Sequence, residues 1–281
     1  MSLPEAKPTS AESTAPAVTG ARVLAYRGGR ATERDDAVAV EEPLDIRVHE
    51  GGESLTLAVS MRTPGHDREL VLGWLYAEGL LHRDAPITLV QDPETPNVVI
   101  LHTSDPHWFL ASARTNVTTS ACGVCGSGSV ERLAVRVGEA VWTAPLLSPA
   151  LLATLPERLR AAQPAFDATG GLHAAGLFTP DGTLLAAFED VGRHNAVDKL
   201  VGWAVGRKLL PLSNHMLVTS SRAGFEIVQK AALAGVPVVV TVGAPSSLAV
   251  ETAAALGLTL VGFARAERFN VYAGTPRLQP S

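Results

Sequence analysis

The chain has 281 residues, enough for about two domains of ~150 residues each. Apolar residues make up 46% of the sequence, and this share excludes an intrinsically disordered chain. The net charge of −5 disfavours nucleic acid as a partner, because proteins that bind a duplex usually carry a basic face.

Residues 1–20 predict a disordered tail. They are rich in Pro, Ser, Thr and Ala, and they lack the basic start and the apolar stretch of a signal peptide. No run of about 18 apolar residues occurs in the chain, so no membrane span is expected. These features together predict a cytoplasmic protein.

Residues 21–106 predict a small α+β domain with the character of a roll. Pro64 and Gly65 interrupt a strand-rich segment, and a helix is expected from Asp67. Apolar side chains recur there at helical spacing, so one face of this helix should pack on a sheet. That face consists of Leu70, Trp74, Ala77 and Leu81. Strands are expected at residues 22–26, 37–39, 44–48, 54–61, 87–90 and 98–102.

Residues 107–146 predict a glycine-rich loop followed by a linker. Hydrophobic periodicity is lost from 107 to 130, which is typical of an exposed, mobile loop. Within it lie the two cysteines of the chain, Cys122 and Cys125. Two cysteines exclude a scaffold held by several disulfides and a zinc site made of four thiolates.

The sequence Cys122-Gly-Val-Cys125 is the strongest chemical signal. A reactive thiol needs access and a stabilised thiolate, and the neighbouring glycines leave the sulfurs uncrowded. The pair therefore favours a thiol that accepts sulfur as a persulfide and passes it on, by the logic of thiol–disulfide exchange. Two alternatives stay open: the thiols are incidental, or they bind zinc with two ligands from His102, His107, His173 and His194.

Residues 147–273 predict an α/β domain, and residues 274–281 a tail. Ser148 and Pro149 are typical of a helix start. The last strands are apolar throughout, so helices should cover both of their faces in a largely parallel sheet. Further helices are expected at 195–208, 225–234 and 247–256. Strands are expected at 173–178, 184–188, 215–219, 237–242 and 259–264.

Polar side chains cluster where several of these strands end. Arg193 and His194 follow one strand, Arg222 follows the next, and Arg265 and Arg268 follow the last. Open α/β sheets bind ligands at this edge, and several arginines there predict an anionic, nucleotide-like or dinucleotide-like ligand. The alternative at each place is a helix cap with charges that face solvent. The usual phosphate-loop and dinucleotide fingerprints are absent.

An ordered set of motifs resembles the FdhD family over roughly residues 22–272. In chain order the motifs are E-L-V-L-G-W-L-Y-A-E-G-L-L, A-C-G-V-C-G, T-G-G-L-H-A-A, E-D-V-G-R-H-N-A-V-D-K, A-P-S-S-L-A-V-E and L-V-G-F-A-R-A-E-R-F-N-V-Y. The resemblance implies that the second domain is a cytidine-deaminase-like, three-layer α/β/α domain without zinc.

The resemblance also implies a sulfurtransferase that works by persulfide relay. Cys122 would carry sulfur from a cysteine desulfurase, with Cys125 as its companion. The recipient would be the molybdenum or tungsten bis-molybdopterin guanine dinucleotide cofactor that formate dehydrogenase requires, and the chain would form a homodimer. The family's cofactor-binding stretch matches Phe263, Ala264, Arg265, Ala266, Glu267 and Arg268, and the strand-end pattern adds Arg193, His194 and Arg222.

Two rival functions remain at this stage. A binding module would hold the cofactor and deliver it to the dehydrogenase without sulfur chemistry. A zinc-dependent nucleotide hydrolase on the same fold is a weaker alternative.

Overall fold

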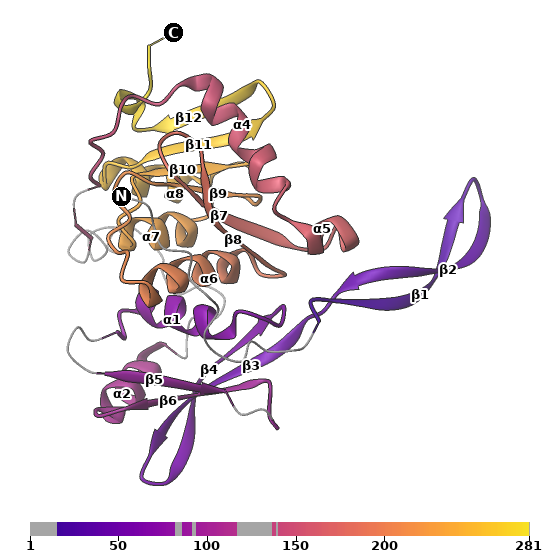
Figure 1. Cartoon of the computed structure of the whole chain (residues 1–281), viewed down its shortest axis with the longest axis vertical. Helices are drawn as coiled ribbons and strands as arrows, with labels where there is room; N and C mark the ends of the chain where they lie inside the picture. The colour runs from indigo at the N-terminus through magenta and orange to yellow at the C-terminus, as the bar shows by residue number, and fades with distance from the viewer. Residues whose placement is uncertain (1–15, 82–85, 92–93, 117–136, 139, 281) are drawn as a thin grey trace.

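The computed structural model describes residues 16–81, 86–91, 94–116, 137–138 and 140–280. Its strands form three sheets: a two-stranded arm, a four-stranded sheet in the N-terminal unit (residues 42–116) and a six-stranded sheet in the C-terminal unit (residues 147–280). The expected mixed α/β class is confirmed, with a smaller unit followed by a three-layer α/β/α unit (Figure 1).

The arm is an antiparallel ribbon that projects from the body of the molecule (Figure 1). It consists of β1 (Val18–Arg27) and β2 (Arg30–Ala39). Residues 18–20 were expected to end a disordered tail, but they pair with residues 37–39 of β2. Pairing along the whole ribbon gives the backbone N–H and C=O groups of residues 18–20 hydrogen-bond partners, so β1 begins there. The small and polar side chains of these residues do not by themselves indicate a strand.

The N-terminal unit has the strand order β4-β3-β6-β5. Its core lies between this sheet and two helices. The strands are β3 (Glu42–Glu50), β4 (Glu53–Arg62), β5 (Ile87–Gln91) and β6 (Val98–Thr103), and the helices are α1 (Asp67–Glu78) and α2 (Pro106–Asn116).

Helix α2 corrects the expectation of a loop from residue 107. The Asp105 carboxylate accepts a hydrogen bond from the Trp108 backbone N–H at 3.2 Å and so caps the first turn. Phe109 is fully buried in the N-terminal core. Leu110 is partly buried against the same core, whereas Trp108 is exposed, so the apolar residues of this helix are adjacent in sequence and do not recur at helical spacing.

The C-terminal unit has the strand order β12-β11-β10-β9-β7-β8. Its strands are β7 (His173–Phe178), β8 (Leu184–Asp190), β9 (Met216–Thr219), β10 (Val238–Thr241), β11 (Thr259–Arg265) and β12 (Arg268–Ala273). Its helices are α4 (Pro149–Arg160), α5 (Pro164–Thr169), α6 (Arg193–Gly206), α7 (Phe225–Leu233) and α8 (Ser247–Ala255), with a 3-10 turn at Thr275–Arg277.

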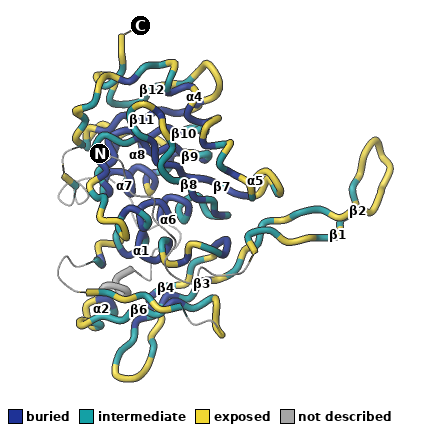
Figure 2. Tube along the Cα trace, in the orientation of Figure 1, coloured by how far each residue is buried: buried dark blue, intermediate teal, exposed yellow. Residues whose placement is uncertain are grey.

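This sheet is mixed rather than largely parallel. Only β9, β10 and β11 run parallel to one another, whereas β7, β8 and β12 pair antiparallel to their neighbours. Short connections at residues 179–183 and 266–267 account for the pairings of β7 with β8 and of β11 with β12, because so short a loop can join only antiparallel strands. Helix α4 covers one face of the sheet and α6, α7 and α8 the other, with a buried core on each side (Figure 2).

The two units meet where α1 crosses α6. A Cβ atom on Gly73 would lie 1.9 Å from the Asp198 carbonyl oxygen, and one on Gly202 would lie 1.8 Å from the Glu69 carbonyl oxygen. The Tyr76 hydroxyl adds a hydrogen bond of 2.7 Å to the Leu233 carbonyl at the end of α7. This close packing places the N-terminal unit against α6 and α7, two of the helices that cover the six-stranded sheet. Among the described helices, none has the length and apolar character needed to span a membrane.

Candidate functional site

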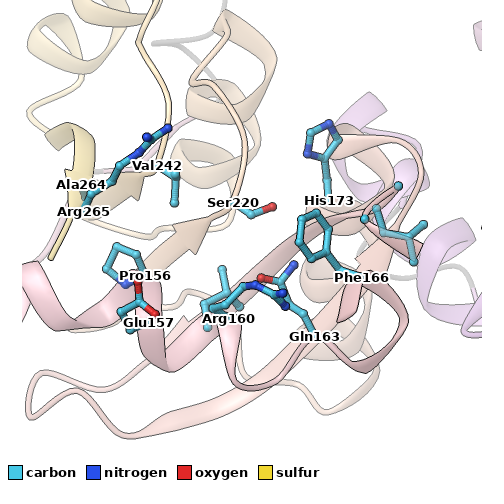
Figure 3. A pocket seen from close by; sticks show the side chains of 14 residues that line it. Pro156, Glu157, Arg160, Gln163, Phe166, His173, Ser220, Val242, Ala264 and Arg265 are labelled. Atoms are coloured by element: carbon cyan, nitrogen blue, oxygen red, sulfur yellow. The ribbon is translucent and has the colours of Figure 1, made fainter. Parts of the chain in front are cut away.

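A cavity of about 450 Å³ opens at one edge of the six-stranded sheet (Figure 3). At this edge β9, β10 and β11 end and the antiparallel strand β7 begins, so residues distant in sequence meet here. The position is the ligand-binding edge expected for an open α/β sheet. The lining residues are Pro156, Glu157, Leu159, Arg160, Gln163, Phe166, Gly170, Gly171, Leu172, His173, Ser220, Val242, Ala264 and Arg265.

Two residues of the expected cofactor-binding stretch and one candidate zinc ligand line this cavity. Ala264 and Arg265 come from the end of β11, and His173 from the start of β7. The Ser220 hydroxyl, at the end of β9, is held by a hydrogen bond of 2.8 Å from the Ala174 backbone N–H. Gly170, the residue that ends α5, has the positive φ of 67° for which glycine is suited.

The opposite side of the cavity consists of residues that the sequence did not single out. Arg160, at the end of α4, and Gln163 and Phe166, at the start of α5, form what we call the α4–α5 wall (Figure 3). Helix α5 is anchored by the Glu189 carboxylate, which accepts hydrogen bonds from the backbone N–H groups of Ala165 (3.0 Å) and Phe166 (2.7 Å). No local pattern marks this wall, because it depends on contact between α5 and β8.

The α4–α5 wall carries hydrogen-bond donors without acceptors. Arg160 stacks on the Phe166 ring, with 4.4 Å from Cζ to the ring centroid, and forms an ion pair with Asp167. Its Nη1 is nevertheless buried without a hydrogen-bond partner among the described residues. The same is true of Nε2 of Gln163, a residue only 2% exposed. A buried donor without an acceptor costs about 1–3 kcal/mol, so these atoms favour a ligand that supplies acceptors.

The expected last strand, 259–264, is the first half of a hairpin, because β11 (Thr259–Arg265) turns back at once into a further strand, β12 (Arg268–Ala273). Arg265 and Arg268 face each other in its register, but they line different hollows. Arg268 lines a smaller one of about 300 Å³, together with Phe263 and two residues of β12. The two arginines, both expected to bind the cofactor, therefore do not line one shared cavity. Ala266 and Glu267 are exposed in the turn.

His194, one of the residues expected to bind the cofactor, carries no positive charge at neutral pH. Burial lowers its pKa from 6.5 to about 4. The Glu226 carboxylate, 3.5 Å from Nε2, opposes this shift, whereas Arg193 adds to it. Burial also lowers the pKa of His173. Both imidazoles are neutral around pH 7, so the positive charge at this edge comes from arginines.

Lys199, in the same motif as His194, is also not available to a ligand. It is 1% exposed, and its Nζ lies 2.7 Å from the Asp190 carboxylate and 2.9 Å from the Thr63 carbonyl oxygen. Asp190 in turn accepts hydrogen bonds from the backbone N–H groups of Thr63 (3.2 Å) and Gly192 (2.8 Å). This part of the E-D-V-G-R-H-N-A-V-D-K motif therefore joins the two units instead of binding an anion.

The remaining predicted residues lie elsewhere. Arg193 begins α6, and Arg222 is exposed in the segment before α7; neither lines the cavity. Cys122 and Cys125 lie outside the described residues. Within the described part of the chain, no cluster of three or more His, Cys, Asp and Glu side chains could hold a metal ion.

The fold and the cavity together define a two-unit α/β protein with a site of nucleotide size at a sheet edge. The model of the FdhD/NarQ family matches residues 39–279, and the chain belongs to this family.

Named relatives agree with this assignment, and a solved structure shares the fold. The chain is 47% identical over 272 residues to the sulfur carrier protein FdhD of Streptomyces coelicolor, covering 92% of this chain and 94% of the relative. It is 44% identical over 275 residues to the Mycobacterium tuberculosis protein of the same name, covering 92% and 97%. A Desulfotalea psychrophila protein, described as a formate dehydrogenase accessory protein, shares the fold with a TM-score of 0.73 and 24% identity, covering 94% and 100% of the two chains.

Proposed function

We propose that this chain is a sulfur carrier for the maturation of formate dehydrogenase. The observation that carries the proposal is the family match over residues 39–279, together with relatives named as sulfur carriers that are 44–48% identical over most of both chains. The Cys122-Gly-Val-Cys125 pair supplies the sulfur chemistry that such a role requires.

The first step is the loading of sulfur onto Cys122. Its thiolate attacks the outer sulfur of a persulfide held by a cysteine desulfurase. The sulfur–sulfur bond of the donor breaks, the donor leaves as a thiolate, and Cys122 becomes a persulfide. No external oxidant or reductant is needed, because sulfur moves between two thiols at the same oxidation level.

The second step is delivery to the client, the molybdenum or tungsten bis-molybdopterin guanine dinucleotide cofactor. Attack of the Cys125 thiolate on Sγ of Cys122 forms a disulfide and releases hydrosulfide for transfer. A thiol reductant then restores both cysteines. The cavity at the sheet edge has the size and the mixture of apolar and polar groups suited to a nucleotide part of the client.

Intact-mass spectrometry tests the sulfur-carrier proposal. After incubation with a cysteine desulfurase and cysteine, the protein should gain the mass of one sulfur atom, and a thiol reductant should remove it. Cys122→Ala should abolish this gain, whereas Cys125→Ala should load normally and fail to release sulfur. A wild-type protein that gains no sulfur, or a gain unaffected by Cys122→Ala, would overturn the relay.

A cofactor-binding module is the outcome that such a failure would favour. In that case Cys122→Ala would support full formate dehydrogenase activity, and loss of the cavity's side chains would abolish it.

A further inference from the structure

We propose that the free edge of β1 pairs with β1 of a second copy of this chain, so that two arms join into one four-stranded antiparallel sheet. The family resemblance implies a homodimer but assigns no surface to it. Pairing of the arms supplies that surface with a defined register, and it does not depend on the proposed sulfur chemistry.

The arm stands away from the body of the molecule with little to stabilise it (Figure 1; Figure 2). None of the residues of β1 and β2 is buried, and Leu24 and Tyr26 are 53% and 70% exposed. Only the base of the arm is supported, where Ala39 lies against Gly171 at the end of α5. A two-stranded ribbon is at best marginally stable in water, whereas three or more strands with an apolar face are stable. We therefore expect further strands to add to the arm.

The turn at residues 28–29 determines which backbone groups of the arm are free. Both residues are glycines with positive φ, 54° and 77°, as a two-residue hairpin turn requires. The residues that flank such a turn exchange backbone hydrogen bonds, and pairs of this kind alternate along an antiparallel ribbon. At the other end of the arm the Val40 N–H donates to the Ala17 carbonyl at 2.9 Å, in agreement with this alternation. The even-numbered residues from 18 to 26 therefore direct their N–H and C=O groups away from β2.

The two edges of the arm differ in charge. Natural proteins place charged side chains on an edge strand to prevent pairing, and β2 carries five of them: Arg30, Glu33, Arg34, Asp35 and Asp36. Between residues 18 and 26, β1 carries one, Arg22, which forms an ion pair with Glu33 at 2.8 Å. The described strand β1 contains no proline and no bulge. The edge of β1 is therefore open to a further strand, whereas the edge of β2 is protected.

A second copy of β1 matches this edge in one register. Antiparallel pairing about a two-fold axis brings identical strands together, as in the isologous interfaces of dimers. With the axis at Val23, each Tyr26 lies opposite Gly20 of the second copy, and each Leu24 lies opposite Arg22. The outward N–H and C=O groups of these four residues are then all paired. An axis at Arg22 would set two guanidinium groups opposite each other, which destabilises a sheet, and an axis at Leu24 would pair fewer residues.

Sedimentation velocity of the full chain tests the assembly, and we expect the wild type to sediment as a dimer. Leu24→Pro removes an N–H that the arm itself does not use, so the arm should persist. The dimer dissociation constant should rise at least about tenfold, on the scale of one lost backbone hydrogen bond. Ala31→Pro is the matched control. Ala31 lies opposite Tyr26, so its N–H points outward from the protected edge of β2, and the dimer should be unchanged.

Cysteine cross-linking tests the register. In a background of Cys122→Ala and Cys125→Ala, Val23→Cys should form a disulfide between two copies on oxidation with diamide. Directly opposed residues that share no hydrogen bond lie about 4.5 Å apart at Cα, within the range of a disulfide. Thr32→Cys, on β2, should give no disulfide under the same conditions.

Several results would overturn this assignment. A monomeric wild type would leave the edge of β1 to a strand of a different protein. A dimer that survives Leu24→Pro, or one that Ala31→Pro disrupts equally, would place the contact elsewhere. A disulfide at Thr32→Cys and none at Val23→Cys would exclude pairing through β1.

Discussion

His194 shows how burial changes the chemistry expected of a residue. In the sequence it stands beside Arg193 at a helix start and suggests a cation for binding an anion. In the structure burial lowers its pKa to about 4, so it is neutral at physiological pH. Its place near Glu226 and Lys230 makes it part of the packing between α6 and α7, and this role has a consequence for stability.

The stability of the protein should fall as the pH drops from 6.5 to about 4. In this window the unfolded chain binds a proton at His194 that the folded chain does not, so protonation favours unfolding. Urea unfolding at several pH values should show the decline, with a shallower slope for His194→Gln. Glu226→Gln removes the carboxylate that raises the pKa of His194, so it should extend the decline to lower pH. Equal slopes for wild type and His194→Gln would contradict this account.

At the scale of elements, the crossing of α1 and α6 depends on glycine. Gly73 and Gly202 lie at the contact, where each faces a backbone carbonyl of the other helix. The sequence correctly predicts α1 from its apolar spacing, and it predicts α6 at 195–208, two residues later at each end than in the structure. Their contact is not visible in the sequence, because a glycine inside a helix carries no signal about the helix that lies against it.

Gly73→Ala should destabilise the protein by more than about 3 kcal/mol, because backbone atoms cannot move aside as a side chain can. Gly206→Ala is the matched control on α6. Its Cβ would lie 3.6 Å from the nearest atom, an ordinary contact, so we expect a change within about 1 kcal/mol. Denaturant unfolding monitored by circular dichroism measures both. Similar costs for the two variants would show that helix propensity, and not the crossing, decides the effect.

At the scale of the whole molecule, a buried ion pair joins the two units. Lys199 and Asp190 belong to the C-terminal unit, and both bind the backbone of Thr63 in the N-terminal unit. Asn195 adds a hydrogen bond of 2.8 Å to the Met61 carbonyl. Figure 1 shows the consequence: the N-terminal unit lies directly against α6, the helix that begins at the sheet edge.

Lys199→Met should cost about 3–5 kcal/mol, because it leaves the Asp190 carboxylate buried without its partner. Adding Asp190→Asn removes the unpaired charge, so the double variant should be less destabilised than the sum of the single changes. Denaturant unfolding gives the free energy of unfolding of the two single variants and of the double variant. Strictly additive losses would contradict direct coupling of the two side chains.

The sequence by itself determined what depends on short-range pattern and on motif order. Local signals indicate the helix start at Ser148-Pro149, the apolar strands and the mixed α/β class. The order of the motifs along the chain indicates the family. Only the tertiary structure decided that the sheet is mixed, that Lys199 joins the two units and that Arg160 and Gln163 lie across a cavity from Arg265. These features depend on contacts between residues far apart in the chain, and burial at such contacts changes charge and hydrogen bonding in ways that neighbours in sequence do not reveal.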